Sequence, residues 1–202
     1  MNSSTPIDPA LQALTRQLGG ALVAALHVPD DPGPPLLLPR AAQPIAPALL
    51  ARAMPGTQAR QEAQALYSRC LAHFRRSALA GAPHDDAGLA AAYFVLANLD
   101  VLHDLHPDAE ALARVERQLR HTLHQLRAWQ RAPLRERQSA CEQLAVIGVL
   151  VAESATAARA QGLVAQAHVQ QAARAYLVRW LGINPDGLRL GPQGLALDLV
   201  VA

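Results

Sequence analysis

The sequence predicts an all-α protein: one domain, 1–202, of about six helices packed around a central apolar helix. Apolar residues make up 51% of the chain and charged residues 17%, which is enough apolar surface to build a buried core. Aromatic residues are only 3%, so Leu, Ala and Val must fill that core, as in closely packed helices. The run LAAAYFVLANL (89–99) is apolar on every side and predicts that helix 86–104 is the central one.

The N-terminal part predicts one helix and a proline-rich connector. Residues 1–7 are expected to be disordered, and a helix is expected from Asp8, an N-cap followed by proline, to about Leu26. Residues 28–47 contain seven prolines, which fix φ and remove backbone donors, so this segment is expected to be extended. Its three consecutive leucines at 36–38 predict that the connector packs on the bundle.

Apolar periodicity and terminal signals predict the remaining elements. The expected helices are 46–54, 57–80, 86–104, 107–131, 133–161 and a last one from 163 to about 181. Thr57 is expected to cap the second of these, Asp85 and Asp86 to open the third, and Gly182 to end the last. The turn signals NPDG (184–187) and GPQG (191–194), with alternating leucines, predict a small β-hairpin within 183–202.

The stretch ANLDVLHDLHPD (97–108) concentrates ionisable residues in an apolar neighbourhood. On a helix, Asp100, His103 and Asp104 would share one face. The preferred interpretation is a helix end, because a cation is favourable near a helix C-terminus and His103 is placed for it. His106 would then cap the helix that starts at Pro107.

The same stretch permits a more specific alternative. VLHDLH resembles the His-Asp core of the HD-type metal-dependent phosphohydrolases, which are all-helical. The resemblance implies a metal held by His73, His103 and Asp104, with the metal activating a water and holding a phosphate. The pattern is incomplete, because no Asp lies between 108 and 186, and Glu142 or the tail would have to supply the last ligand.

A basic stripe follows the predicted helix 107–131. Its members are Arg114, Arg117, Arg120, His121, His124, Arg127 and Arg131. Such a stripe can receive an acidic protein surface, since Arg makes bidentate contacts with carboxylates. A solvated face balanced by Glu110, Glu116 and Glu136 is the alternative interpretation.

The sequence lacks a complete catalytic motif, and we expect no cofactor. Cys70 and Cys141 are not in a C-x-x-C pair; two buried free thiols are expected, or one disulfide if the protein is exported. A net charge of +2 and few aromatics do not favour nucleic-acid binding. We expect no membrane span and interpret LAVIGVLVA (144–152) as a core helix. Asn98, between apolar neighbours, is expected to be buried and to bond another helix.

Three segments occur in an order that resembles a bacterial helical family known as a domain of unknown function. They are AAYFVLANLDVL (91–102), RQSACEQLAVIGVLV (137–151) and LGINPDGLRLGPQGL (181–195). The resemblance covers about the last two-thirds of the chain and implies the helical layout but no activity. The sequence thus predicts a non-enzymatic interaction factor of adaptor, chaperone-like or immunity type, cytoplasmic or alternatively exported, which binds another protein through a helix face. Its oligomeric state is left open.

Overall fold

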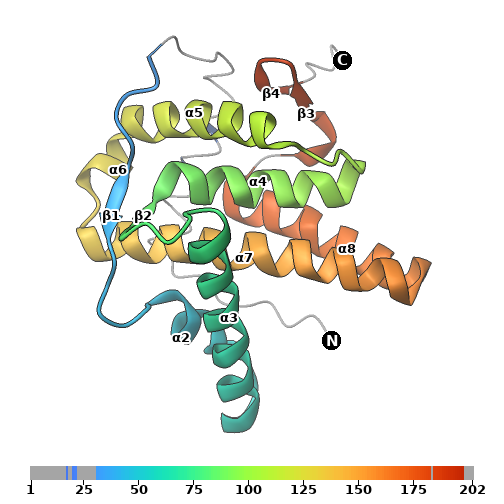
Figure 1. The fold of residues 1–202 in the computed structure, drawn as a ribbon. Helices are drawn as coiled ribbons and strands as arrows, with labels where there is room; N and C mark the ends of the chain where they lie inside the picture. Colours follow the sequence, from blue (N-terminus) through green and yellow to red (C-terminus); the bar gives the residue numbers. More distant parts are fainter. Residues whose placement is uncertain (1–16, 18–19, 22–30, 183, 198–202) are drawn as a thin grey trace.

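The computed structural model describes residues 17, 20–21, 31–182 and 184–197. The predictions for residues 1–7, for most of the helix from Asp8, and for the end of the tail lie outside these residues. Within them the chain forms seven α-helices and two small antiparallel sheets, which confirms the all-α prediction (Figure 1).

The central helix is α4 (Ala87–His103), as predicted. It lies between α5 (Ala109–Gln125) and α7 (Leu134–Gln161), and it also packs against α8 (Leu163–Tyr176) (Figure 1). Its first turn is capped by Asp86, whose Oδ1 accepts a hydrogen bond from the Leu89 N–H at 3.1 Å. Phe94 and Leu99 are fully buried.

Small residues allow α4 and α7 to approach closely. A Cβ atom at Gly148 of α7 would lie 2.9 Å from Cδ1 of Tyr93 and 3.2 Å from the backbone of Phe94.

Cys70 and Cys141 are both buried and free, as expected. Within the described chain, α7 is the one helix that is long and apolar enough to cross a membrane. However, 61% of its most apolar 18-residue segment is buried inside the protein, as in a core helix.

Several helices differ from their expected boundaries or caps, and two of the differences matter for the packing. α3 (Thr57–Ser77), which packs against α2 (Ala46–Ala51) and projects from the bundle, begins after Gly56, and Thr57 makes no capping hydrogen bond (Figure 1). The predicted helix 107–131 is in fact two helices, α5 and α6 (Arg127–Arg131), because Leu126 is extended with φ −78° and ψ 105°. This break places Trp129 in the core, where it is 4% exposed.

From residue 31 on, where the structure describes it, the proline-rich connector packs on the bundle and forms a short sheet that the sequence did not indicate. β1 (Leu37–Pro39) pairs antiparallel with β2 (His84–Asp86). Leu38 of β1 is buried at 4% exposure, opposite Asp85. Asp85 therefore does not join Asp86 in opening α4; its carboxylate is buried and ion-paired with Arg75.

The C-terminal hairpin is present as predicted. α8 continues into a π-helical turn, Leu177–Leu181, and Gly182 ends it in the left-handed conformation with φ 65°. After a 3-10 turn at Pro185–Gly187, β3 (Leu188–Gly191) pairs with β4 (Gly194–Leu197). The hairpin lies over α5 (Figure 1).

Candidate functional site

The polar end of α4 is a loop with an unusual backbone. α4 ends at His103, and Asp104 follows in the left-handed conformation with φ 52°. His106 also has a positive φ, 47°. Residues other than glycine rarely adopt this backbone conformation and need surrounding contacts to hold them in it. The interpretation of this stretch as a helix end is confirmed.

The carboxylate of Asp100 holds the loop. Its Oδ1 accepts a hydrogen bond from the His106 N–H at 2.7 Å and lies 3.3 Å from Nδ1 of the same ring. Nε2 of His106 lies 3.1 Å from Oδ1 of Asp104. The prediction that His106 caps the next helix is therefore wrong. Asp108 is the cap, because its Oδ1 accepts the Ala111 N–H at 2.7 Å.

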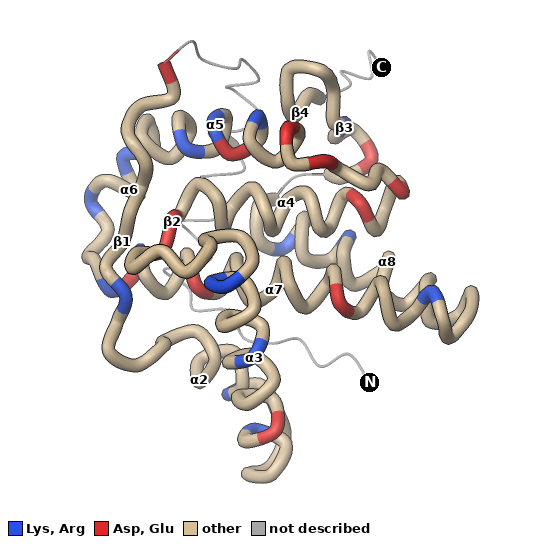
Figure 2. The backbone as a smooth tube through the Cα atoms, viewed as in Figure 1, with Lys and Arg blue, Asp and Glu red and all other residues tan. Residues whose placement is uncertain are grey.

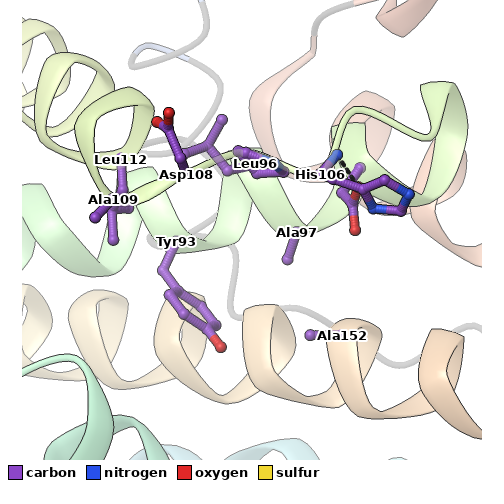
Figure 3. Close-up of a pocket in the computed structure, with 10 residues that line it drawn as sticks. Tyr93, Leu96, Ala97, His106, Asp108, Ala109, Leu112 and Ala152 are labelled. Atoms are coloured by element: carbon purple, nitrogen blue, oxygen red, sulfur yellow. Dashed lines mark hydrogen bonds and ion pairs between the residues drawn. The ribbon is translucent and has the colours of Figure 1, made fainter.

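A pocket of about 370 Å³ lies beside this loop, between α4, α5 and α7 (Figure 3). Most of its lining is apolar: Leu96, Ala97, Pro107, Ala109, Leu112 and Ala152. The polar groups that line it belong to Tyr93, Asp100, His106 and Asp108. Figure 3 shows Tyr93 extending from α4 toward α7, with its hydroxyl at the far end of the ring.

Tyr93 keeps its hydroxyl available in the pocket. Its ring packs edge-on against Phe74, with centroids 5.6 Å apart. Burial raises the pKa of Tyr93, and the negative charge of Glu153 raises it further, so the hydroxyl is protonated at neutral pH. No hydrogen bond joins this hydroxyl to another residue of the described chain.

A second hollow, of about 240 Å³, lies on the other side of Asp100, between α4, α7 and α8. Its lining is more polar and includes Arg159, Gln166 and Gln170. The Arg159 guanidinium lies 3.9 Å from Oδ2 of Asp100, which makes a weak, half-exposed ion pair. Asp100 thus lines both hollows.

The residues of the alternative metal site do not meet. His73 lies on α3, which packs against α2 and α7. His103 points Nε2 toward the carbonyl oxygen of Pro185, at 3.4 Å, and Asp104 is 81% exposed beyond the helix. In the part of the chain that the structure describes, no three His, Cys, Asp or Glu side chains are close enough to hold a metal ion. This geometry gives the phosphohydrolase interpretation no support.

The predicted basic stripe is partly neutralised within α5 itself. Arg114 pairs with Glu110 at 2.7 Å, and Arg120 pairs with Glu116 at 3.2 Å. The side chains of the two arginines are only 22% and 13% exposed. Burial raises the pKa of Glu116, while the charge of Arg120 lowers it. These arginines are therefore poorly placed to meet a partner.

The C-terminal part of the stripe divides into covered and open residues. Nε2 of His124 lies 2.9 Å from the carbonyl oxygen of Pro34, so the connector covers this ring. Arg117 and His121 are half-buried. Arg127 is exposed, because the break at Leu126 places it in α6.

Basic residues are frequent instead in α6 and at the start of α7 (Figure 2), and those at 127, 131 and 135 are exposed. We call Arg127, Arg131, Leu134 and Arg135 the α6 patch. Its three arginines are exposed and make no ion pair with the described residues, and Leu134 is 42% exposed. Glu136 is the one acidic residue between 127 and 140.

The sequence analysis did not identify Tyr93 or Arg159 as residues of the site, and it predicted only part of the environment of Asn98. Tyr93 sits in an apolar run that predicts burial and nothing more, and Arg159 is distant in sequence from Asp100. Asn98 is fully buried, as expected, but its amide donates to the Phe94 carbonyl of its own helix at 2.7 Å and not to another helix. Its Oδ1 has no hydrogen-bond partner among the described residues.

Comparisons with known proteins assign the chain to a family without naming an activity. No curated protein and no solved structure matches it. A profile of a family of unknown function (DUF6683) matches residues 39–198, which include every element from α2 to β4. The match extends further toward the N-terminus than the resemblance seen in the sequence. The chain therefore belongs to this family of unknown function, DUF6683.

Proposed function

We propose that this protein is a non-enzymatic interaction factor that binds an acidic surface of another protein through the α6 patch. The observation that carries the proposal is the exposure of three arginines, around an exposed leucine, without carboxylate partners in the described chain. Arginine is enriched in protein interfaces because its planar guanidinium pairs bidentately with carboxylates. An apolar side chain among such charges provides a desolvated contact.

The same patch is less suited to nucleic acid. It has no exposed aromatic side chain for base stacking, since Trp129 is 4% exposed. The net charge of +2 gives little general attraction to phosphates. A folded acidic protein therefore fits better than a nucleic acid.

The proposal keeps the predicted helix-face interaction and moves its centre. Arg127 and Arg131 are shared with the predicted stripe, whereas Arg114 and Arg120 are engaged with glutamates of their own helix. The adaptor, chaperone-like and immunity-type roles all stay within the proposal, because each consists in binding another protein. A cytoplasmic setting is part of the proposal, supported by the free thiols of Cys70 and Cys141.

Titration of a fluorescent poly-glutamate peptide tests the electrostatic part. Arg131→Glu should weaken binding about tenfold or more, and salt should weaken binding to the unmodified protein. Arg76→Glu, an exposed position on α3, changes the net charge equally and should leave the affinity nearly unchanged. Equal losses in the two variants would mean general charge attraction and would contradict a specific patch.

Photo-crosslinking from position 130, in a lysate of the source cells, tests the partner. The expected product is one acidic protein that Arg131→Glu and Leu134→Ala both lose and that Arg76→Glu keeps. Capture of nucleic acid, or of the same protein by all variants, would overturn the proposal.

A further inference from the structure

The pocket beside Asp100 has no part in the proposed protein interface. The α6 patch lies past the C-terminal end of α5, whereas Ala109 and Leu112 line the pocket from its first turns. Sites for small molecules are typically concave and mostly apolar, with a few polar groups that set orientation. A volume of about 370 Å³ falls within the usual range of such sites.

The lining specifies an apolar body for the ligand. Leu96 is 3% exposed and forms the wall with alanines from three helices and with Leu112. The ring of Tyr93 closes one side, against α7 (Figure 3). Water gains few hydrogen bonds on these surfaces, so an apolar group that displaces it is favoured.

The charge around the pocket specifies a cationic head. Acidic residues are frequent at this end of α4 and in the loop that follows it (Figure 2). They are Asp100, Asp104 and Asp108, with Glu153 of α7 close enough to raise the pKa of Tyr93. The structure pairs Asp100 and Asp104 with Arg159, at 3.9 Å from each, and with the ring of His106, at 3.3 and 3.1 Å. A concave surface lined by one sign of charge concentrates ligands of the opposite sign.

One carboxylate oxygen of Asp100 makes no short contact with another residue of the described chain. Its Oδ1 is occupied by His106, through the 2.7 Å bond from the backbone N–H and the 3.3 Å approach of Nδ1. Its Oδ2 has only the long contact with Arg159. The Tyr93 hydroxyl, without a partner in the described chain, is a further polar group of the same pocket, on the side of α7 (Figure 3).

We propose that this pocket binds a small organic cation, with an apolar body against Leu96, Leu112 and Tyr93 and an ammonium group at Oδ2 of Asp100. His106 is a positioning residue, because it fixes the orientation of the Asp100 carboxylate.

Three probes of similar shape and different charge test the ligand class. They are phenethylamine, 2-phenylethanol and 3-phenylpropanoate, each titrated at neutral pH by calorimetry and ligand-observed NMR. The amine should bind about tenfold or more tightly than the alcohol, because a charge-assisted hydrogen bond replaces a neutral one. The carboxylate should bind weakest of the three.

Two variants test the placement. Asp100→Asn keeps an acceptor for the His106 N–H and removes the charge, so the preference for the amine over the alcohol should vanish. Ala152→Leu fills the pocket from α7 and should abolish binding of all three probes. Glu62→Gln, on the exposed face of α3, removes a carboxylate elsewhere and should change nothing.

The result of these binding experiments does not depend on the proposed protein interface at the α6 patch. Arg131→Glu should leave amine binding intact, so either proposal can fail alone. Equal affinities for the amine and the alcohol, absence of saturable amine binding, or unchanged binding by folded Ala152→Leu protein would each overturn the assignment of this pocket.

Discussion

The guanidinium of Arg75 on α3 lies 3.1 Å from the carboxylate of Glu142 on α7, 67 residues away along the chain. The same guanidinium donates two hydrogen bonds to Asp85, at 2.9 and 2.5 Å. The other oxygen of Glu142 accepts the N–H groups of Ile45 and Ala46, at 2.6 and 2.9 Å. Burial lowers the pKa of Arg75, but the hydrogen bonds and charges of the two carboxylates outweigh it and raise the pKa overall. One buried network thus ties the connector, α2, α3 and β2 to α7.

Glu142→Ala should destabilise the protein severely. The substitution leaves the part-buried Arg75 with one carboxylate and removes the acceptor for two N–H groups at the start of α2. Breaking a buried ion pair by removing one partner costs about 3–5 kcal/mol. Urea unfolding, followed by circular dichroism, measures the free-energy difference.

Glu153→Ala is the matched control for that experiment. Glu153 is exposed on the same helix, so its loss should change the unfolding free energy by less than about 0.5 kcal/mol. Similar effects of the two substitutions would show that the buried network does not hold the connector in place.

The pH dependence of the unfolding free energy should reflect the titration of the Glu142 carboxyl group. Burial raises its pKa, although hydrogen bonds from Ala46 and Ile45 and the charge of Arg75 oppose the shift. The folded protein therefore holds this proton to a higher pH than the unfolded chain, whose Glu pKa is about 4.3. The contribution of this group to stability is present below that value and is lost as the pH rises through the folded pKa.

Glu142→Gln isolates this effect. The variant cannot titrate at position 142, so its unfolding free energy should fall less, or rise more, with pH across the window just above about pH 4.3. Urea unfolding of both proteins at closely spaced pH values measures the difference in slope. Parallel curves would mean that the pKa of Glu142 is the same in the folded and unfolded states.

The sequence predicted the elements whose signals are local. The all-round apolar run marked α4, Gly162 marked the boundary of α7 and α8, and two turn motifs marked the hairpin. The network around Arg75 was not predictable in this way. Nothing near Glu142 in sequence distinguishes it from a surface glutamate, because its partners come from elements far away along the chain.

The candidate site was located in part. Its position at the end of α4 followed from the charges of residues 97–108. The direction of His106 did not, because it depends on a left-handed turn at Asp104, and glycine is the usual sequence signal for such a turn. The break at Leu126 was missed for a related reason, since the apolar seam of the two helices continues across it.

Gly148→Ala should destabilise the protein although alanine favours helix. In a free helix this substitution gains about 1 kcal/mol. Here the new Cβ would lie 2.9 Å from the Tyr93 ring and 3.2 Å from the backbone of Phe94, which cannot move without separating α4 from α7. Overpacking of this kind costs about 1–3 kcal/mol, so a net loss is expected.

Thermal unfolding of Gly148→Ala, beside Thr156→Ala at an exposed position of the same helix, measures this effect. The threonine variant should match or slightly exceed the stability of the unmodified protein. A Gly148→Ala protein that is more stable than the unmodified one would show that α4 and α7 are less closely packed than the structure indicates.

Gln118→Met should release the C-terminal hairpin from α5. The Gln118 amide is 1% exposed and pairs with the backbone of Leu195 on both sides: its Nε2 donates to the carbonyl at 3.0 Å, and its Oε1 accepts the N–H at 2.8 Å. Methionine fills a similar volume but leaves both backbone groups buried and unpaired, which costs about 1–3 kcal/mol for each group. Hydrogen exchange should therefore accelerate at the Leu195 amide far more than in α4. Gln125→Met, exposed on the same helix, should leave that amide protected; equal acceleration in the two variants would refute the anchoring role of Gln118.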